Sequence, residues 1–330
     1  MKRRTIVSLL AASLVILLAI TACAPTAEEA VTSEPVEEIV EETVEEEVMP
    51  EEGPWTGIGT EENPIIFVAV PSGETERVLA GFEQVADLIY ESTGLVIEPF
   101  VATSYSAAIE AMCAQPPQAH MGALATFSYI LAAEKGCAET ALVSTRFGTA
   151  FYNGQFVVRA DSGIETLEDL AGKSWCRASA TSTSGAIIPG MMLRGVGIDP
   201  DTDLGEMIDT GSHEAAAVGV FAGDCDFATT YVDARTREEE NNPGIMDETV
   251  VIALMPDIPN DGIQFHPDFP AEVKEQLIQA FMGLFETEEG AAAMEEAYQW
   301  TGLEEHGDDF YDAFRQVLDA AGISPEELAK

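Results

Sequence analysis

Basic residues are scarce in this sequence. Its 330 residues include 15 lysines and arginines against 59 aspartates and glutamates, which gives a formal net charge of −44. Proteins that bind nucleic acid neutralise backbone phosphates with Lys and Arg, so this composition argues against a nucleic-acid partner. An anionic ligand has to be held by local dipoles and hydroxyl groups that overcome the repulsive mean field of the chain.

The sequence also lacks the short motifs of several reactive sites. Its four histidines and five cysteines are scattered, and none has the CxxC or Cys/His spacing of a zinc site. The GxxxxGK[ST] loop that cradles nucleotide phosphates is absent, as is the GxSxG elbow of the α/β-hydrolases. The sequence therefore predicts neither a metal site nor a cofactor.

A single long apolar run occurs, over residues 6–20, and the basic residues 2–4 precede it. It is shorter than the roughly 20 residues of a membrane-spanning helix, and it has the form of a signal peptide. The run ends at Ile20-Thr21-Ala22-Cys23, which resembles a bacterial lipobox. We predict a lipoprotein signal peptide over residues 1–23, with Cys23 lipidated. An ordinary secretory signal with an incidental cysteine is the alternative.

The segment that follows is strongly acidic. Ala24–Glu52 contains twelve glutamates and no lysine or arginine. Such a chain repels itself and has too little apolar surface to fold. We predict a disordered tether over residues 24–59 between a lipid anchor and a folded body, although a helical tether stays open. This organisation indicates the extracytoplasmic face of a membrane, in the periplasm or at the cell surface.

The body alternates strand and helix patterns and then restarts, which predicts two doubly wound α/β lobes around a hinged ligand cleft, with C-terminal helices. We assign residues 60–150 to lobe 1, residues 151–255 to lobe 2, and residues 256–330 to a helical return to lobe 1. Strands are predicted over 65–70, 95–101, 119–124, 141–147, 155–159, 174–177, 226–231 and 250–254. Helices are predicted over 74–92, 105–114, 127–134, 167–170, 186–194, 212–222, 271–285, 291–297 and 310–321.

Hydroxyl residues gather at one strand-to-helix turn. Ser182-Thr183-Ser184-Gly185 follows a predicted strand and precedes a predicted helix. Free N–H groups and hydroxyls at a helix start bind anions with the help of the helix dipole. Plain N-capping without a ligand explains the same residues. His213 stands at the start of another helix, where it can donate to an oxyanion or simply cap the helix.

Five segments in order carry a family resemblance. They are TSYSAAIEAM, FYNGQFVVRADSGIETLEDLAGK, STSG followed by a proline, GSHEAAAVGVFAGDCDFA and MPDIPND. Over Ile65 to Phe285 the chain resembles the phosphate/phosphite/phosphonate-binding lipoproteins of ABC importers. The resemblance implies the type II periplasmic-binding-protein fold, a small phosphorus-oxyanion ligand and a membrane permease as partner.

The resemblance also implies the residues of a site. It assigns ligand contacts to Tyr105, Tyr152, Ser182, Thr183, Ser184 and His213. It also implies that Asp233 or Asp261 recognises an amino group of the ligand. Two departures occur. Ser179-Ala180 stand where the family has Asp-Pro, and Ala186 replaces an aromatic residue. We expect both changes to touch the wall of the pocket and to affect the organic part of the ligand.

Four cysteines remain after Cys23, and an even number in an exported protein indicates disulfides. Two of them lie at or beside neighbouring strands of the second lobe, and two flank a strand–helix unit of the first. We predict the pairs Cys113–Cys137 and Cys176–Cys225.

Three functions remain in competition. The leading one is a monomeric, lipid-anchored solute receptor that binds a phosphorus oxyanion and performs no catalysis. The second keeps the fold but takes another anionic ligand, such as a sulfonate or a thiamine phosphate. The third is a hydrolase in which Ser182 or Ser184 acts with His213 and an aspartate, and the serine cluster and missing elbow argue against it.

Overall fold

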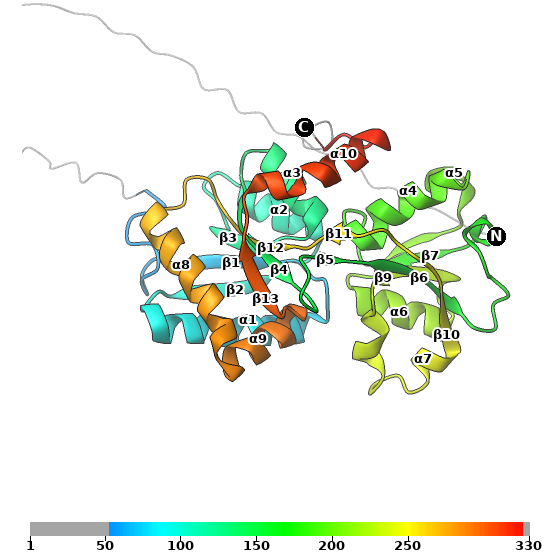
Figure 1. Cartoon of the computed structure of the whole chain (residues 1–330), viewed down its shortest axis with the longest axis horizontal. Coiled ribbons are helices and arrows are strands. Elements are labelled where there is room, and N and C mark those ends of the chain that lie inside the picture. The colour runs from blue at the N-terminus through cyan, green and yellow to red at the C-terminus, as the bar shows by residue number, and fades with distance from the viewer. Residues whose placement is uncertain (1–52, 326–330) are drawn as a thin grey trace, which may run out of the picture. The chain divides into compact units, whose positions relative to one another are not determined.

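Residues 53–325 are described by the computed structural model of the chain (Figure 1). The predicted signal peptide over residues 1–23, the lipidation site Cys23 and tether residues 24–52 lie outside this described part. Within it, no helix is long and apolar enough to cross a membrane.

The last residues of the predicted tether belong to the folded body. Ile58 is buried, and the Trp55 ring packs 5.3 Å from the ring of His120, centroid to centroid. Gly59 accepts a backbone hydrogen bond of 2.8 Å from Val96 at the start of the second predicted strand. The prediction of a tether over residues 24–59 is therefore wrong for residues 53–59, where one tryptophan and one isoleucine supply enough apolar surface to fix the chain.

The first lobe is built on a six-stranded mixed sheet in the order β13-β4-β12-β3-β1-β2. Central β1 pairs in parallel with β2 and β3, while β12 runs antiparallel between β3 and β4 and β13 runs antiparallel to β4 at the edge. The strands are β1 (Ile65–Ala69), β2 (Ile97–Val101), β3 (Met121–Ala123), β4 (Glu139–Thr145), β12 (Gly262–Phe265) and β13 (Gly302–Glu305).

Two features of this sheet correct the sequence prediction. The segment after Pro256 is not wholly helical, because β12 and β13 return to the first sheet before and between the C-terminal helices. Gly262–Phe265 has only four residues, all buried, so it has no polar alternation to reveal a strand. The strand predicted to reach Phe147 ends at Thr145, and Phe147 lies in a turn with a φ of 53° and 89% exposure.

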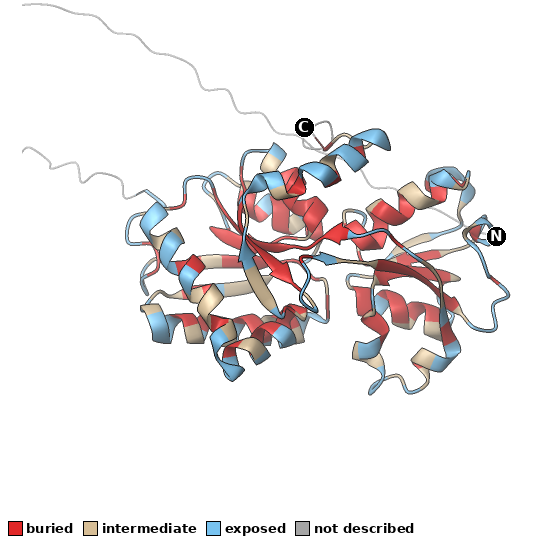
Figure 2. Ribbon diagram, viewed as in Figure 1, coloured by how far each residue is buried: buried red, intermediate tan, exposed pale blue. Residues whose placement is uncertain are grey.

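Helices of the first lobe cover the faces of this sheet. Helix α1 begins after Glu74, whose carboxylate accepts from the backbone N–H groups of Glu76 and Arg77, and it ends at Gly94 with a φ of 76°. It packs on α8 and α9, and α2 packs on α3. The helices are α1 (Thr75–Thr93), α2 (Tyr105–Cys113), α3 (Thr126–Glu134), α8 (Ala271–Gly283), α9 (Glu288–Tyr298) and α10 (Asp312–Ala320). Their buried sides face the strands and their exposed sides face outward (Figure 2).

The second lobe has a five-stranded mixed sheet in the order β10-β6-β9-β7-β8. Strand β7 pairs in parallel with β8 and β9, whereas β6 runs antiparallel to β9 and β10. The strands are β6 (Gly154–Arg159), β7 (Trp175–Arg177), β8 (Met207–Asp209), β9 (Phe227–Tyr231) and β10 (Thr249–Leu254), and the helices are α4 (Ile188–Gly195), α5 (Pro200–Asp203), α6 (His213–Ala222) and α7 (Ile245–Glu248).

The chain passes between the two sheets through a pair of short strands. β5 (Phe151–Tyr152) and β11 (Ile258–Pro259) pair antiparallel and lie between the lobes in Figure 1. The result is a pair of α/β lobes joined by two adjacent crossings, which is the hinged arrangement that the sequence predicts.

Each lobe contains one disulfide. Cys113 at the end of α2 pairs with Cys137, with Cα atoms 5.0 Å apart. Cys176 on β7 pairs with Cys225, which lies just before the neighbouring strand β9, with Cα atoms 5.9 Å apart. Both pairs have the connectivity predicted from the strand order.

Candidate functional site

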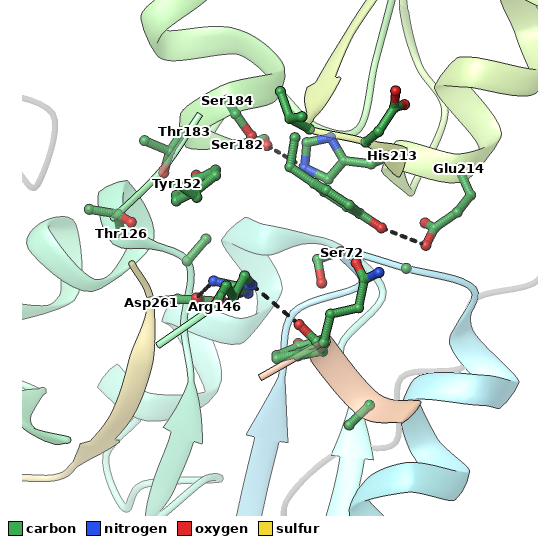
Figure 3. A pocket seen from close by; sticks show the side chains of 18 of the residues that line it. Ser72, Thr126, Arg146, Tyr152, Ser182, Thr183, Ser184, His213, Glu214 and Asp261 are labelled. Atoms are coloured by element: carbon green, nitrogen blue, oxygen red, sulfur yellow. Dashed lines mark hydrogen bonds and ion pairs between the residues drawn. The ribbon is translucent and has the colours of Figure 1, made fainter. Parts of the chain in front are cut away.

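A cavity of about 320 Å³ lies between the lobes, beside the two crossings. All eight ligand contacts predicted from the sequence line it, so residues from six separate stretches of the chain meet at one place (Figure 3). The predicted residues in its wall are Tyr105, Tyr152, Ser182, Thr183, Ser184, His213, Asp233 and Asp261.

The hydroxyl turn forms one wall. Ser182 caps a wide helical turn over Thr183–Ile187 that leads directly into α4, and its Oγ accepts from the backbone N–H of Gly185 at 3.1 Å. The helix therefore starts three residues before the predicted Ala186. Ser182, Thr183 and Ser184 are almost fully buried. Ser182 caps the turn and also lines the cavity, so capping does not exclude a ligand contact at the same residue.

One glycine of the second lobe allows this turn to approach the sheet. A Cβ atom added to Gly154, at the start of β6, would lie 3.0 Å from the Cβ of Ser184 and would overlap the sulfur of Met255. A side chain at this position would push the hydroxyl turn out of place. The backbone of β6 therefore supports the cavity wall from behind.

Two tyrosine hydroxyls face the hydroxyl turn from the first lobe and the crossing. Tyr105 is the first residue of α2, and Tyr152 lies on β5. Burial raises the pKa of Tyr152 to about 12, opposed first by a hydrogen bond with Ser184. Burial also raises the pKa of Tyr105 above its usual range, and a hydrogen bond with Ser182 opposes that shift. Both phenols therefore stay neutral at physiological pH, where each can donate one O–H.

His213 completes this group as the first residue of α6, which Ser212 caps. Its Nε2 lies 3.3 Å from Ser182 Oγ. Burial lowers the pKa of His213 to about 4. The nearby backbone of Thr229 partly opposes this shift, although Nδ1 of His213 makes no hydrogen bond of full geometry. Nearby Arg146 lowers the pKa further. The imidazole is neutral at physiological pH and can accept as well as donate.

The Ser182–His213 contact resembles two members of a catalytic triad, but the third member is missing. Nδ1 of His213 is buried and has no hydrogen-bond partner among the described residues. The adjacent carboxylate of Glu214 is engaged elsewhere, by Arg77 and Tyr231. A nucleophilic serine needs its histidine held in the productive tautomer by an acidic partner, so the hydrolase interpretation lacks its geometry.

Contacts across the cavity join the lobes. The backbone N–H of Phe127, at the start of α3, donates to Thr183 Oγ1 at 3.0 Å. The N–H of His213 donates to the Ser72 carbonyl at 3.2 Å. Because these contacts join groups of different lobes, they define a closed arrangement of the cleft.

The sequence interpretation missed the arginines of the site. Arg146 forms an ion pair with Asp261, its Nη1 lying 2.8 Å from Oδ1, and Arg77 of α1 pairs with Glu214 of α6 at 2.9 Å. Asp233 lines the cavity and pairs with Arg235 at 2.6 Å. No local pattern marks the Arg146–Asp261 and Arg77–Glu214 pairs, whose partners are 115 and 137 residues apart. The further lining residues are Ser72, Gly73, Ala125, Thr126, Phe147, Tyr231, Val232, Thr236, Ala297, Tyr298 and Gln299.

The two departures from the family pattern lie outside the cavity wall. Ala186 is buried in the hydrophobic core on the far side of the hydroxyl turn, and neither Ser179 nor Ala180 lines the cavity. The expectation that these positions touch the pocket is wrong, because the turn presents Ser182 to Ser184 to the cavity and Ala186 to the core. Nor do the described residues contain a group of three side chains suited to hold a metal ion.

Solved structures show the fold class of the chain. The chain superposes on a binding-protein component of an ABC phosphonate transporter from Pseudomonas aeruginosa with a TM-score of 0.72 and 21% identity, over 78% of this chain and 87% of that one. PhnD1 from Prochlorococcus marinus, solved with methylphosphonate, gives a TM-score of 0.70 at 14% identity, over 82% of this chain and all of that one. The fold is that of the type II periplasmic binding proteins.

Sequence comparison then gives the family. Residues 67–311 match the family described as "ABC transporter, phosphonate, periplasmic substrate-binding protein", and the chain belongs to this family of transport receptors, which are not enzymes. It is 28% identical over 172 residues to the phosphate-import protein PhnD of Mycolicibacterium smegmatis, covering 49% of this chain and 53% of that protein. It is 27% identical over 152 residues to the phosphonates-binding periplasmic protein of Escherichia coli, covering 45% of each. The chain thus spans about half the length of these curated relatives.

Proposed function

We propose that this protein is an extracytoplasmic receptor that captures a small phosphorus oxyanion, a phosphonate, phosphite or phosphate, and delivers it to an ABC permease. The single observation that carries the proposal is the cluster of uncharged donors around one end of the cavity. Three hydroxyls of one turn, two tyrosine hydroxyls and a neutral imidazole converge there, at Ser182, Thr183, Ser184, Tyr105, Tyr152 and His213.

The helices add to this arrangement. Four helical segments begin at residues of the cavity wall, namely Tyr105 of α2, Thr126 of α3, Thr183 of the hydroxyl turn and His213 of α6. Each start carries the positive end of a helix dipole. Their combined field favours an anion without a free cationic side chain, which suits a chain of such acidic composition.

The size and enclosure of the cavity agree with a small ligand. Its volume of about 320 Å³ is near the lower end of the roughly 300–1,000 Å³ that small-molecule sites have. Phosphorus oxyanions also carry P–OH groups when monoprotonated, and hydroxyls or a neutral imidazole can accept from them. A sulfonate or sulfate lacks this proton, so its binding would use the donors of the site alone.

Delivery and anchoring complete the proposal. A lipid on Cys23 and the acidic segment from residue 24 would hold a monomeric receptor near its permease, on the extracytoplasmic side that the family implies. Metabolic labelling with a fatty acid tests the anchor. Label should enter the wild-type chain and be absent from Cys23→Ser, and labelling of both proteins equally would contradict the lipidation.

A ligand panel tests the binding function. Thermal unfolding of the purified chain should be followed with phosphate, phosphite, methylphosphonate, sulfate, a sulfonate and thiamine phosphate. A ligand at one hundred times its dissociation constant stabilises the folded state by about 2.7 kcal/mol. A shift with a phosphorus oxyanion and none with sulfate supports the proposal. A shift only with a sulfonate or with thiamine phosphate would favour the corresponding alternative ligand.

A further inference from the structure

The acidic side chains of the cavity wall are all paired with arginine. Among the described lining residues the carboxylates are Glu214, Asp233 and Asp261. Each lies within 2.9 Å of a guanidinium nitrogen, from Arg77, Arg235 and Arg146 respectively. Three negative and three positive groups therefore balance, in a chain whose formal net charge is −44.

Further hydrogen bonds hold both partners of the Arg146–Asp261 pair. Nη1 of Arg146 donates to Asp261 Oδ1 at 2.8 Å and Nη2 donates to Oδ2 at 3.3 Å, so both carboxylate oxygens are occupied. Nη1 also lies 2.8 Å from Asn260 Oδ1, and Ser144 Oγ lies 3.1 Å from Asp261 Oδ1. Bidentate pairs held by further hydrogen bonds are the strong and geometrically fixed ones.

Arg146 also occupies an aromatic face. Its Cζ lies 5.7 Å from the centroid of the Tyr152 ring. A ligand ammonium would use such a face for a cation–π contact. Here a resident cation holds that position beside the hydroxyl turn, so a second cation would meet repulsion instead of an empty aromatic surface.

Asp233 is closed off in the same way. Its Oδ1 accepts from Arg235 Nε at 2.9 Å and its Oδ2 accepts from Arg235 Nη2 at 2.6 Å, while Gln155 Nε2 donates to Oδ1 at 2.8 Å. Arg235 is itself buried, and its Nη1 donates to the Thr249 carbonyl at 2.9 Å. The arginine is fixed from both sides, so it cannot readily leave the carboxylate to a ligand.

The third carboxylate serves the contact between the lobes. Glu214 Oε1 accepts from Arg77 Nη2 at 2.9 Å and from the Tyr231 hydroxyl at 3.1 Å. Arg77 reaches it from α1, and further donates to the Ala297 carbonyl at 3.4 Å. Its Oε2 has no hydrogen-bond partner among the described residues. Arg77 already balances the charge of this carboxylate, so an amine bound at Oε2 would add a second cation to one counter-ion.

From these contacts we infer that the site selects phosphorus oxyanions whose organic substituent carries no positive charge, and that Arg146 and Arg235 set this specificity by occupying Asp261 and Asp233. The inference rests on the proposed function. A buried ammonium needs a counter-ion, and an arginine already balances each carboxylate of the described wall. An uncharged alkyl group needs no partner and can lie against the tyrosine rings of the cavity.

Two ligands of nearly equal shape test the inference. Propylphosphonate and 2-aminoethylphosphonate differ by a terminal methyl in place of an ammonium group, and calorimetric titration of the purified chain gives a dissociation constant for each. Propylphosphonate should bind at least tenfold more tightly. Equal affinities, or tighter binding of the amine, would overturn the inference.

Variants then test the assigned residues. Arg146→Met and Arg235→Met each remove a guanidinium and free one carboxylate. Either variant should shift the ratio of the dissociation constants for propylphosphonate and 2-aminoethylphosphonate at least tenfold in favour of 2-aminoethylphosphonate. Arg159→Met, which removes a surface arginine paired with Asp161, is the matched control and should keep the wild-type ratio. An unchanged ratio in both folded cavity variants would overturn the assignment, and if one fails to fold the other still decides.

Phosphate and methylphosphonate in the same titrations separate the two proposals. If the wild-type chain binds them but prefers the amine over propylphosphonate, the inference fails and the receptor function stands. If no phosphorus compound binds, the proposed function fails and the inference falls with it.

Discussion

Replacing Thr183 by valine tests whether one hydroxyl both closes the cleft and holds the ligand. Thr183 Oγ1 accepts from the backbone N–H of Phe127 at 3.0 Å, and the two residues belong to different lobes and are each only 1% exposed. Thr183→Val keeps the shape of the side chain but removes the acceptor. In the closed arrangement the Phe127 N–H would then be buried without a partner.

The expected cost follows from that one group. An unsatisfied buried donor costs about 1–3 kcal/mol, and each 1.4 kcal/mol is a factor of ten in affinity. Ligand affinity should therefore fall roughly 5- to 150-fold, and more if the hydroxyl also contacts the ligand. When the lobes are apart, water can hydrate the Phe127 N–H, so the stability of the ligand-free chain should change little.

Calorimetric titration with the tightest phosphorus ligand measures the affinity, and urea unfolding without ligand measures the stability. Thr183→Ser is the control, because it keeps the hydroxyl and should keep most of the affinity. The reasoning would be refuted if Thr183→Val binds as tightly as Thr183→Ser. It would also fail if the valine variant lost the same free energy without ligand as with it.

Three further predictions follow from the site and the lobes. Ser184→Ala should weaken ligand binding by about 1–3 kcal/mol, because it removes a hydroxyl of the cavity wall; unchanged affinity in a titration would contradict a contact there. Burial lowers the pKa of His213 to about 4, so between that pH and its unfolded value near 6.5 the unfolded chain binds more protons. The contribution of the neutral His213 to folding stability is complete above about pH 6.5. It is lost as the pH falls toward 4, by about 3 kcal/mol in total. The unfolding free energies of wild type and His213→Gln, measured with urea, should diverge over this range, and parallel pH dependences would contradict the prediction. Replacing Cys176 and Cys225 together by alanine opens a link across 49 residues and should cost about 4 kcal/mol of unfolding free energy by the loop-entropy estimate, whereas a midpoint equal to wild type in oxidising buffer would show that the bridge contributes nothing.

Local patterns made the cavity wall predictable. Ser182 to Ser184 stand between a strand and an apolar helix, and His213 follows Gly211-Ser212 at a helix start, so neighbouring residues alone indicate where these side chains lie. Helix starts follow short-range rules of capping and apolar spacing. Tyr105 and Tyr152 depended on the family resemblance, because a lone tyrosine has no local pattern that marks it as a cavity residue.

The charge balance of the site could not be predicted in this way. Arg146 and Asp261 lie 115 residues apart. They meet because β12 pairs with β4, and Arg146 directly follows β4 while Asp261 directly precedes β12. No pattern in the sequence marks that pairing, because β12 is short and wholly buried. Ion pairs of this kind depend on sheet order, which propensity and spacing leave open. Asp233 and Arg235 are two residues apart, so this pair was within reach of a local interpretation.

The placement of the disulfides has a mechanical consequence. Each of the two bridges among the described residues cross-links a single lobe, and the only strands that pass between the sheets are the paired β5 and β11. The disulfides therefore stiffen each lobe and leave the β5–β11 crossing compliant. A force that separates the lobes would bend Phe151–Tyr152 and Ile258–Pro259 first. Because Tyr152 is also part of the cavity wall, the compliant joint and the ligand share a residue, and strain at one is transmitted directly to the other.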